Sequence, residues 1–209
     1  MPRRPDDRLS TALDRRVAAV FGGPVAGVDE AGRGPLAGPL VVAAVILPPG
    51  LAGTGELADS KRLAEAEREA LGRFVRARAQ AWAVWRISPR AIDRDGMGRA
   101  WARAVVAALA ALPVRPAAAI IDGPVAPRVD GMAMVPVVDG DRLSASVMAA
   151  ALVAKTARDG EMRRWHGRFP AFGFDRHKGY ATPEHRQALG REGPCPIHRR
   201  SFLSADDPA

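Results

Sequence analysis

Acidic side chains stand beside apolar runs at three places in this 209-residue chain. They are Asp29 with its neighbour Glu30, then Asp122, and then Asp141. Carboxylates held a few Å apart repel one another strongly unless a cation compensates them. Oxygen donors suit Mg²⁺ or Mn²⁺, and two such ions about 3.5–4 Å apart can cleave a phosphodiester bond. If the three places meet in the fold, they predict a divalent-metal site.

Each acid also has an ordinary structural interpretation. Asp141 could cap a helix, and Asp122-Gly123 is a common turn pair. Asp29 and Glu30 pose a geometric problem, because neighbours on a regular strand face opposite sides of the sheet. Both could face one metal only if the strand breaks there, and the glycines that follow would allow such a break. The shared position at strand ends favours the metal site.

The apolar pattern predicts an α/β fold, a mixed sheet flanked by helices. Strands are expected over residues 25–29, 40–47, 81–88, 117–121 and 132–138. Helices are expected over 1–20, 59–79, from 89 with an interruption near Gly96, around 101–112, over 143–165 and near 183–191. The Gly/Pro-rich connection after the first strand favours an antiparallel pair. If the strands ending at Asp29 and Asp122 are parallel neighbours, their carboxylates converge at one edge.

The composition is basic, with 31 Lys and Arg against 23 Asp and Glu and a formal net charge of +8. Such a surface suits nucleic acid, although an arginine-rich composition alone would also produce it. The single cysteine, Cys195, excludes an intrachain disulfide and favours a reducing compartment. No signal peptide and no membrane-length apolar run is evident. We therefore expect a cytoplasmic monomer without a membrane partner.

Nucleophilic or zinc-dependent catalysis has no support in the sequence. The four histidines and Cys195 lack the spacing of a zinc site. Neither a Gly-x-Ser-x-Gly elbow nor a phosphate-binding P-loop is present. A metal site built from carboxylates is therefore the chemistry that the residues favour.

Several segments resemble the bacterial ribonuclease HII family, the type 2 ribonucleases H. They are G-V-D-E-A-G-R-G-P-L-A-G-P (27–39), A-D-S-K-R-L (58–63), I-I-D-G (120–123), G-D (140–141), A-A-A-L-V-A-K-T-A-R-D (149–159), F-P-A-F-G-F-D-R-H-K-G-Y (169–180) and H-R-R-S-F (198–202). Because they follow one another in order over most of the chain, the resemblance is specific. The chain differs from the family pattern at Asp139, where the family usually has Lys, and at Ala151, where the family usually has Ser.

The resemblance implies an RNase H-like mixed five-stranded sheet flanked by helices, with a small C-terminal helical and loop extension. We expect one integrated domain with an N-terminal arm or short helix (1–20), a catalytic part (21–168) and a C-terminal extension that contributes to substrate binding (169–209). The implied activity is endonucleolytic cleavage of the RNA strand in RNA/DNA hybrids. It includes incision 5′ to single ribonucleotides in duplex DNA, leaving 3′-hydroxyl and 5′-phosphate ends.

The resemblance also implies a role for individual residues. The catalytic residues and metal ligands would be Asp29, Glu30, Asp122 and Asp141, with two Mn²⁺ or Mg²⁺ ions. The substrate-binding residues would be Gly32, Arg33, Gly34, Ser60, Lys61, Lys178 and Tyr180. Of these, Gly32-Arg33-Gly34 would sense the 2′-hydroxyl, Tyr180 would lie against the sugar, and the lysines would hold phosphates.

Two other functions remain open from the sequence. The chain could be a non-catalytic nucleic-acid-binding protein whose acids serve as caps and turn residues. It could also be a metal phosphatase that acts on small phosphoesters. Incubating a duplex that carries one ribonucleotide with Mn²⁺, Mg²⁺ or EDTA would distinguish these possibilities.

Overall fold

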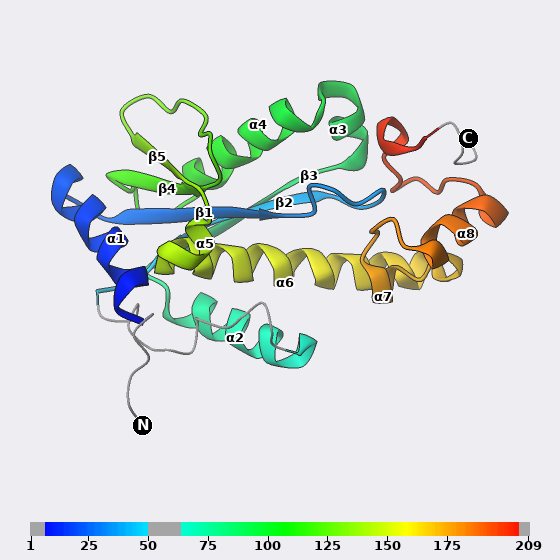
Figure 1. Cartoon of the computed structure of the whole chain (residues 1–209), viewed down its shortest axis with the longest axis horizontal. Helices are drawn as coiled ribbons and strands as arrows, with labels where there is room; N and C mark the ends of the chain where they lie inside the picture. Colours follow the sequence, from blue (N-terminus) through cyan, green and yellow to red (C-terminus); the bar gives the residue numbers. More distant parts are fainter. Residues whose placement is uncertain (1–6, 50–63, 205–209) are drawn as a thin grey trace.

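One mixed sheet forms the centre of the molecule (Figure 1). The structure, a computed structural model, describes residues 7–49 and 64–204. Over these residues the strands are β1 (Val25–Ala31), β2 (Leu40–Ile46), β3 (Ala81–Ile87), β4 (Ala118–Asp122) and β5 (Ala133–Val137), in the spatial order β3-β2-β1-β4-β5. β1 pairs antiparallel with β2 and parallel with β4. The predicted α/β fold, with a mixed five-stranded sheet and an antiparallel first pair, is confirmed.

Helices cover both faces of this sheet. In the described residues they are α1 (Asp7–Phe21), α2 (Glu65–Arg78), α3 (Pro89–Asp95), α4 (Met97–Ala110), α5 (Gly140–Leu143), α6 (Ala145–Arg168), α7 (Phe174–His177) and α8 (Pro183–Glu192), with short 3₁₀ turns at Pro170–Phe172 and Arg200–Phe202. α4 lies on one face, and α6 with α2 lies on the other (Figure 1). The first residues of the helix expected over 59–79 lie outside the described residues. None of the described helices is long and apolar enough to cross a membrane.

The long helix expected over 143–165 is divided near its start. Ser144 has extended backbone angles (φ −126°, ψ 125°), and its side chain accepts a hydrogen bond from the N–H of Val147. Ser144 therefore caps α6 and separates it from the single turn of α5. This turn carries Asp141, so the break decides where that carboxylate lies.

The start of α6 lies directly against β1. A Cβ atom on Gly27 would lie 2.0 Å from the carbonyl carbon of Ser146, so only glycine permits this approach. From the other side, the Asp14 carboxylate in α1 accepts hydrogen bonds of 3.1 Å from the N–H groups of Ala145 and Ser146. These two contacts hold the start of α6 against β1 on one side and α1 on the other.

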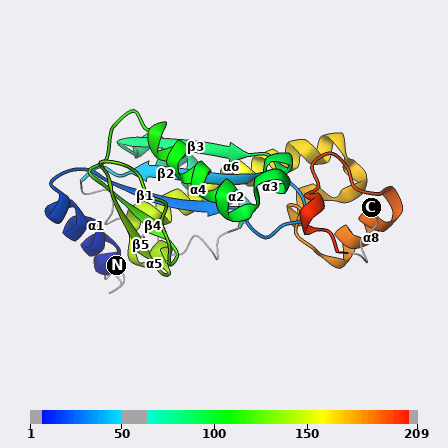
Figure 2. The same cartoon turned by 90° about the horizontal axis from the view of Figure 1, so that it is seen from above.

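The C-terminal elements pack at the far end of α6, opposite α1 (Figures 1 and 2). Their apolar cluster joins Phe172, Phe174, Leu189 and Ile197 to Met162 of α6. A β-bridge between Ala37 and His198 ties the same elements to the connection between β1 and β2. The extension therefore contacts the loop that follows Asp29 and Glu30.

Candidate active site

Asp29 and Asp122 lie side by side on two parallel neighbouring strands: Asp122 is the last residue of β4, and Asp29 lies two residues before the end of β1. Val28 in β1 pairs with Ile121 in β4, so the residues that follow them are adjacent. Both acidic side chains point toward α6, because they alternate with Val28 and Ile121, which pack on the α4 side. The expected convergence of these two carboxylates is present in the structure.

Asp141 joins them through the short helix α5. The backbone N–H of Gly140 donates to Oδ1 of Asp122 at 2.8 Å, and this bond docks the start of α5 against β4. The N-cap position of α5 belongs to Asp139, which has a left-handed backbone (φ 55°). Asp141 therefore lies inside the first turn of α5, and helix capping does not account for it.

The electrostatic cost of this arrangement falls on Asp29. Its side chain is buried, and its pKa is raised from 3.8 to about 8. Burial is the largest cause, and the nearby carboxylates of Asp122, Glu30 and Asp141 add to it. The N–H of Glu30 donates to Oδ1 of Asp29 at 2.7 Å and opposes the shift only in part. A cation at this position would relieve the repulsion.

Glu30 lies on the opposite face of the sheet. β1 does not break after Asp29, because Glu30 and Ala31 remain paired with Val42 and Val41 of β2. The break considered from the sequence is therefore absent. The Glu30 carboxylate instead accepts hydrogen bonds from the Trp101 indole at 2.9 Å and from Arg33 at 3.1 Å.

Trp101 is a contact that the sequence pattern did not reveal. Its spacing in α4 predicts only a buried apolar face, and the residue is indeed buried. A buried indole N–H still needs an acceptor, and Glu30 provides it. The need of a buried indole N–H for an acceptor could have indicated such a contact from the sequence. The helical spacing alone could not identify Glu30 as the acceptor.

The donor set suits a hard divalent cation. Each candidate ligand is a carboxylate, which Mg²⁺ and Mn²⁺ prefer. Burial, and after it the repulsion between these carboxylates, raises the pKa of Asp29. As the side chains stand, no group of three or more His, Cys, Asp or Glu within the described residues is arranged to hold a metal ion. Asp29, Asp122 and Asp141 lie together, whereas the Glu30 carboxylate faces Trp101 and Arg33 on the other side of the sheet.

The Gly32-Arg33-Gly34 turn follows β1 directly. Gly32 has a positive φ of 91°, and a Cβ there would lie 2.0 Å from Nε of Arg158. Gly34 is exposed and has no atom within 4 Å of its Cβ position. Between them, the Arg33 guanidinium lies 5.3 Å from the Trp101 ring and remains half exposed. The two glycines therefore differ. Gly32 makes space for the buried Arg158 side chain, and Gly34 leaves the outer surface of the turn open to a ligand.

Tyr180 lies next to this turn although it is 146 positions further along the chain than Gly34. The N–H groups of Leu36 and Ala37 donate to the carbonyl oxygen of Gly179 at 2.9 and 3.3 Å. Tyr180 is 46% exposed, so it remains available to a ligand. The structure thus brings Tyr180 to the loop that carries Arg33.

Comparisons with known proteins agree with this site. Residues 26–205 match the family described as Ribonuclease HII. The chain belongs to the ribonuclease HII family. It is 49% identical over 178 residues to Ribonuclease HII of Bordetella pertussis, covering 85% of this chain and 88% of that protein. The predicted class of enzyme, a ribonuclease H, is confirmed.

Solved structures share the fold of this chain. The crystal structure of ribonuclease H2 from Pyrococcus horikoshii OT3 has a TM-score of 0.74 and 28% identity, covering 85% of this chain and 93% of that one. Bst-RNase HIII in complex with Mn²⁺ has a TM-score of 0.64 and 21% identity, covering 91% of this chain and 65% of that one. The second likeness supports the fold alone.

Lys178 is placed differently from the other substrate-binding candidates. It is buried, and its ammonium group lies 3.0 Å from Oε1 of Glu65 in α2 and also donates to the carbonyl of Asp175. The pairing lowers the pKa of Glu65, chiefly through the Lys178 hydrogen bond. Lys178 therefore joins α2 to the C-terminal extension. Ser60 and Lys61 lie outside the described residues.

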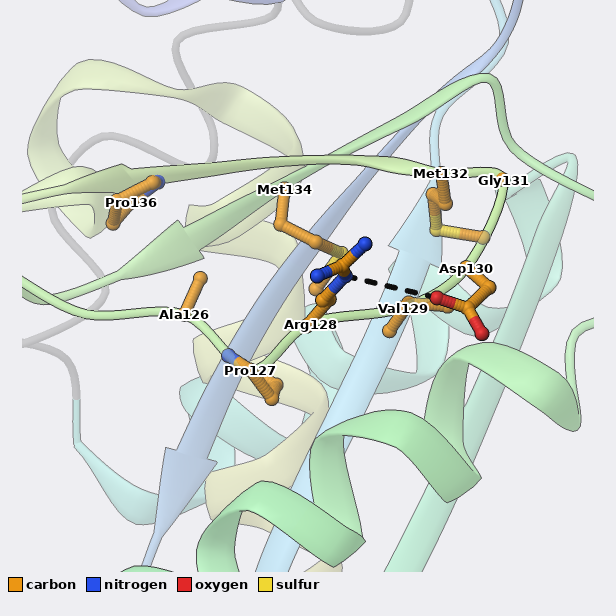
Figure 3. A pocket seen from close by; sticks show the side chains of 9 residues that line it. All are labelled: Ala126, Pro127, Arg128, Val129, Asp130, Gly131, Met132, Met134 and Pro136. Carbon is orange, nitrogen blue, oxygen red and sulfur yellow. Dashed lines mark ion pairs between the residues drawn. The ribbon is translucent and has the colours of Figure 1, made fainter.

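A pocket of about 500 Å³ lies under the connection between β4 and β5 (Figure 3). Its lining residues are Ala126, Pro127, Arg128, Val129, Asp130, Gly131, Met132, Met134 and Pro136. Arg128 and Asp130, which form an ion pair across its rim at 3.7 Å, are almost fully exposed. The lining includes none of the acids at the strand ends, so this pocket is separate from the candidate active site.

Proposed function

We propose that this protein cleaves the RNA strand of RNA/DNA hybrids and incises duplex DNA 5′ to single ribonucleotides. The products would carry 3′-hydroxyl and 5′-phosphate ends. The observation that carries the proposal is the meeting of Asp29, Asp122 and Asp141 at one sheet edge, directly before the Gly32–Gly34 turn. The net charge of +8 supports a polyanionic substrate.

The chain's own residues would prepare the site for metal-dependent hydrolysis. When bound by Asp29, Glu30, Asp122 and Asp141, two Mg²⁺ or Mn²⁺ ions supply an activated water and stabilisation of the leaving 3′-oxygen. The Gly140 N–H orients the Asp122 carboxylate before any ligand arrives. Burial and the neighbouring carboxylates raise the pKa of Asp29 to about 8, so metal binding near neutral pH would release a proton from this side chain.

Recognition of ribose would come from the turn after β1 and from Tyr180. The 2′-hydroxyl is the group that separates RNA from DNA. The open position at Gly34 lets a sugar–phosphate backbone approach closely, and the exposed Tyr180 ring offers a surface for the sugar. We assign Gly32, Arg33, Gly34 and Tyr180 to this role, Ser60 to substrate binding, and Lys61 and Lys178 to phosphate binding. Lys178 would have to leave its contact with Glu65 to reach a phosphate.

The wider assignments belong to the same proposal. The N-terminal arm or helix (1–20), the catalytic part (21–168) and the extension (169–209) would act as one domain and as a monomer. A cytoplasmic location rests on the single cysteine, Cys195, which is a free thiol. No membrane partner is proposed.

A cleavage assay on defined duplexes tests the proposed function. The substrates are a duplex with one ribonucleotide, an RNA/DNA hybrid and an all-DNA duplex, each with Mg²⁺, Mn²⁺ or EDTA. We expect a cut 5′ to the ribonucleotide with either ion, none with EDTA, and none in all-DNA. The Asp29→Asn variant should bind the duplex and cut at least about 100-fold more slowly, because the negative charge of a metal ligand is lost. Salt-sensitive binding without a product would instead indicate a non-catalytic binding protein.

A further inference from the structure

Arg158 and Arg199 are buried behind the loop that carries the Gly32–Gly34 turn. Arg158 belongs to α6 and Arg199 to the segment after α8, and they are 1% and 0% exposed. A buried guanidinium is costly unless its donors find acceptors. Burial lowers the pKa of both groups, and that of Arg199 falls to about 9. Both find acceptors in the backbone of residues 32–39.

Arg199 binds both ends of this loop. Its Nε donates to the carbonyl of Gly38 at 3.0 Å, its Nη1 to that of Arg33 at 3.0 Å, and its Nη2 to that of Gly32 at 2.5 Å. A planar guanidinium can direct donors to several carbonyls at once, which a lysine ammonium cannot do with the same geometry. Arg199 therefore sets the spacing between the turn and the residues before β2.

Arg158 joins the same loop to Tyr180. Its Nε donates to the carbonyl of Pro39 and its Nη2 to that of Ala37, each at 3.1 Å. Its guanidinium also lies 5.9 Å from the centre of the Tyr180 ring. Gly32 is packed against the Arg158 side chain. Arg158 thus touches both parts of the proposed ribose-recognition site from the inside.

The segment that carries Arg199 is itself held in place. The N–H of Arg199 donates to the carbonyl of Leu36 at 2.8 Å, next to the β-bridge between Ala37 and His198. The Asp93 carboxylate in α3 accepts from the N–H groups of Arg200 and Ser201, each at 3.0 Å. The backbone of Arg199 is therefore fixed by neighbouring elements, so its guanidinium can hold the loop in one place.

We propose that Arg158 and Arg199 are positioning residues for ribose recognition, which hold the 32–39 loop and Tyr180 in one register relative to the strand-end acids. The inference rests on the proposed function. An RNA/DNA hybrid presents a 2′-hydroxyl at every position of its RNA strand, so a displaced loop still meets one. A duplex with one ribonucleotide presents a single 2′-hydroxyl, so loss of register affects its cleavage most.

The test compares two substrates in conservative variants of the full chain. Arg158→Lys and Arg199→Lys keep the charge and remove the fork of donors. Arg76→Lys is the matched control, because Arg76 contacts α6 through Thr156 and does not contact the loop. For each protein, kcat and KM are measured with Mn²⁺ on the single-ribonucleotide duplex and on the hybrid, well below the melting temperature of each variant.

We expect both loop variants to lose roughly tenfold or more in kcat on the single-ribonucleotide duplex, because small misplacements of a reacting group reduce rates steeply. KM and hybrid cleavage should change by less than about threefold, and Arg76→Lys should keep the wild-type ratio of the two activities. A smaller folded fraction lowers both activities equally and leaves that ratio unchanged. An unchanged ratio in both loop variants, or an equal change in Arg76→Lys, overturns the inference. If the wild type cleaves neither substrate, the proposed function itself fails, and the inference fails with it.

Discussion

At the scale of single residues, the site is built around a carboxylate that the fold disfavours. Asp29 is buried beside Asp122, Glu30 and Asp141, and its pKa is about 8. A pKa raised above the unfolded value means that the folded state loses stability as the pH rises from about 4 to about 8. The metal-free protein therefore bears the cost of an acid that only a bound cation would relieve.

Asp29→Asn should stabilise the metal-free protein while it removes cleavage. The amide keeps an oxygen for the N–H of Glu30 and carries no charge. The gain should increase from pH 5 to pH 8 and reach a few kcal/mol, since each unit of pKa corresponds to about 1.4 kcal/mol. Thermal unfolding in EDTA at several pH values measures it. Asp130→Asn, at a fully exposed side chain, should show no such trend, and a gain independent of pH for Asp29→Asn would contradict the explanation.

At the scale of elements, the contact between α6 and β1 places Asp141 beside Asp29. Gly27→Ala would put a Cβ 2.0 Å from the Ser146 carbonyl carbon, a backbone atom that cannot move aside without moving α6. We expect a loss of about 3 kcal/mol or more and slower cleavage, measured by thermal unfolding and by the duplex assay.

The control for this prediction is Gly98→Ala in α4. No atom lies within 4 Å of its Cβ position, and alanine favours a helix more than glycine does. This variant should be as stable as the wild type or slightly more stable. Equal stability of Gly27→Ala and Gly98→Ala would show that the packing of α6 on β1 does not depend on Gly27.

The strands, and the acids that follow their apolar runs, could be predicted from local sequence pattern. Buried strands require consecutive apolar residues, and such runs are visible in the sequence. Apolar runs ended at Asp29 and Asp122, and the parallel pairing of their strands brought both together as expected. The contact between Glu30 and Trp101, in contrast, joins residues 71 positions apart. Arginine usually lies at the surface, so no local pattern marked Arg158 and Arg199 as buried. Their acceptors are carbonyls, which every residue has.

At the scale of the whole molecule, the C-terminal extension is held by a network of neutral histidines. His185 and His198 approach at 3.0 Å between their Nε2 atoms, and the rings of His177 and His185 stack at 4.5 Å. The N–H of Cys195 donates to Nδ1 of His198, and Nδ1 of His185 lies 2.8 Å from the carbonyl of Tyr180. The network therefore supports the backbone that carries Tyr180.

Acid should open this extension before it unfolds the sheet. Burial lowers the pKa of His177, His185 and His198, the last to about 4. A pKa below the unfolded value means that stability is complete above about pH 6.5 and is lost as the pH falls toward 4. Hydrogen exchange should therefore show less protection of residues 172–199 at pH 5 than at pH 7.5. Protection of β1 and β2 at the same two pH values serves as the internal reference. His198→Gln should weaken this pH dependence because one titrating ring is removed. Equal protection of the extension at both pH values would mean that the histidines do not control its docking.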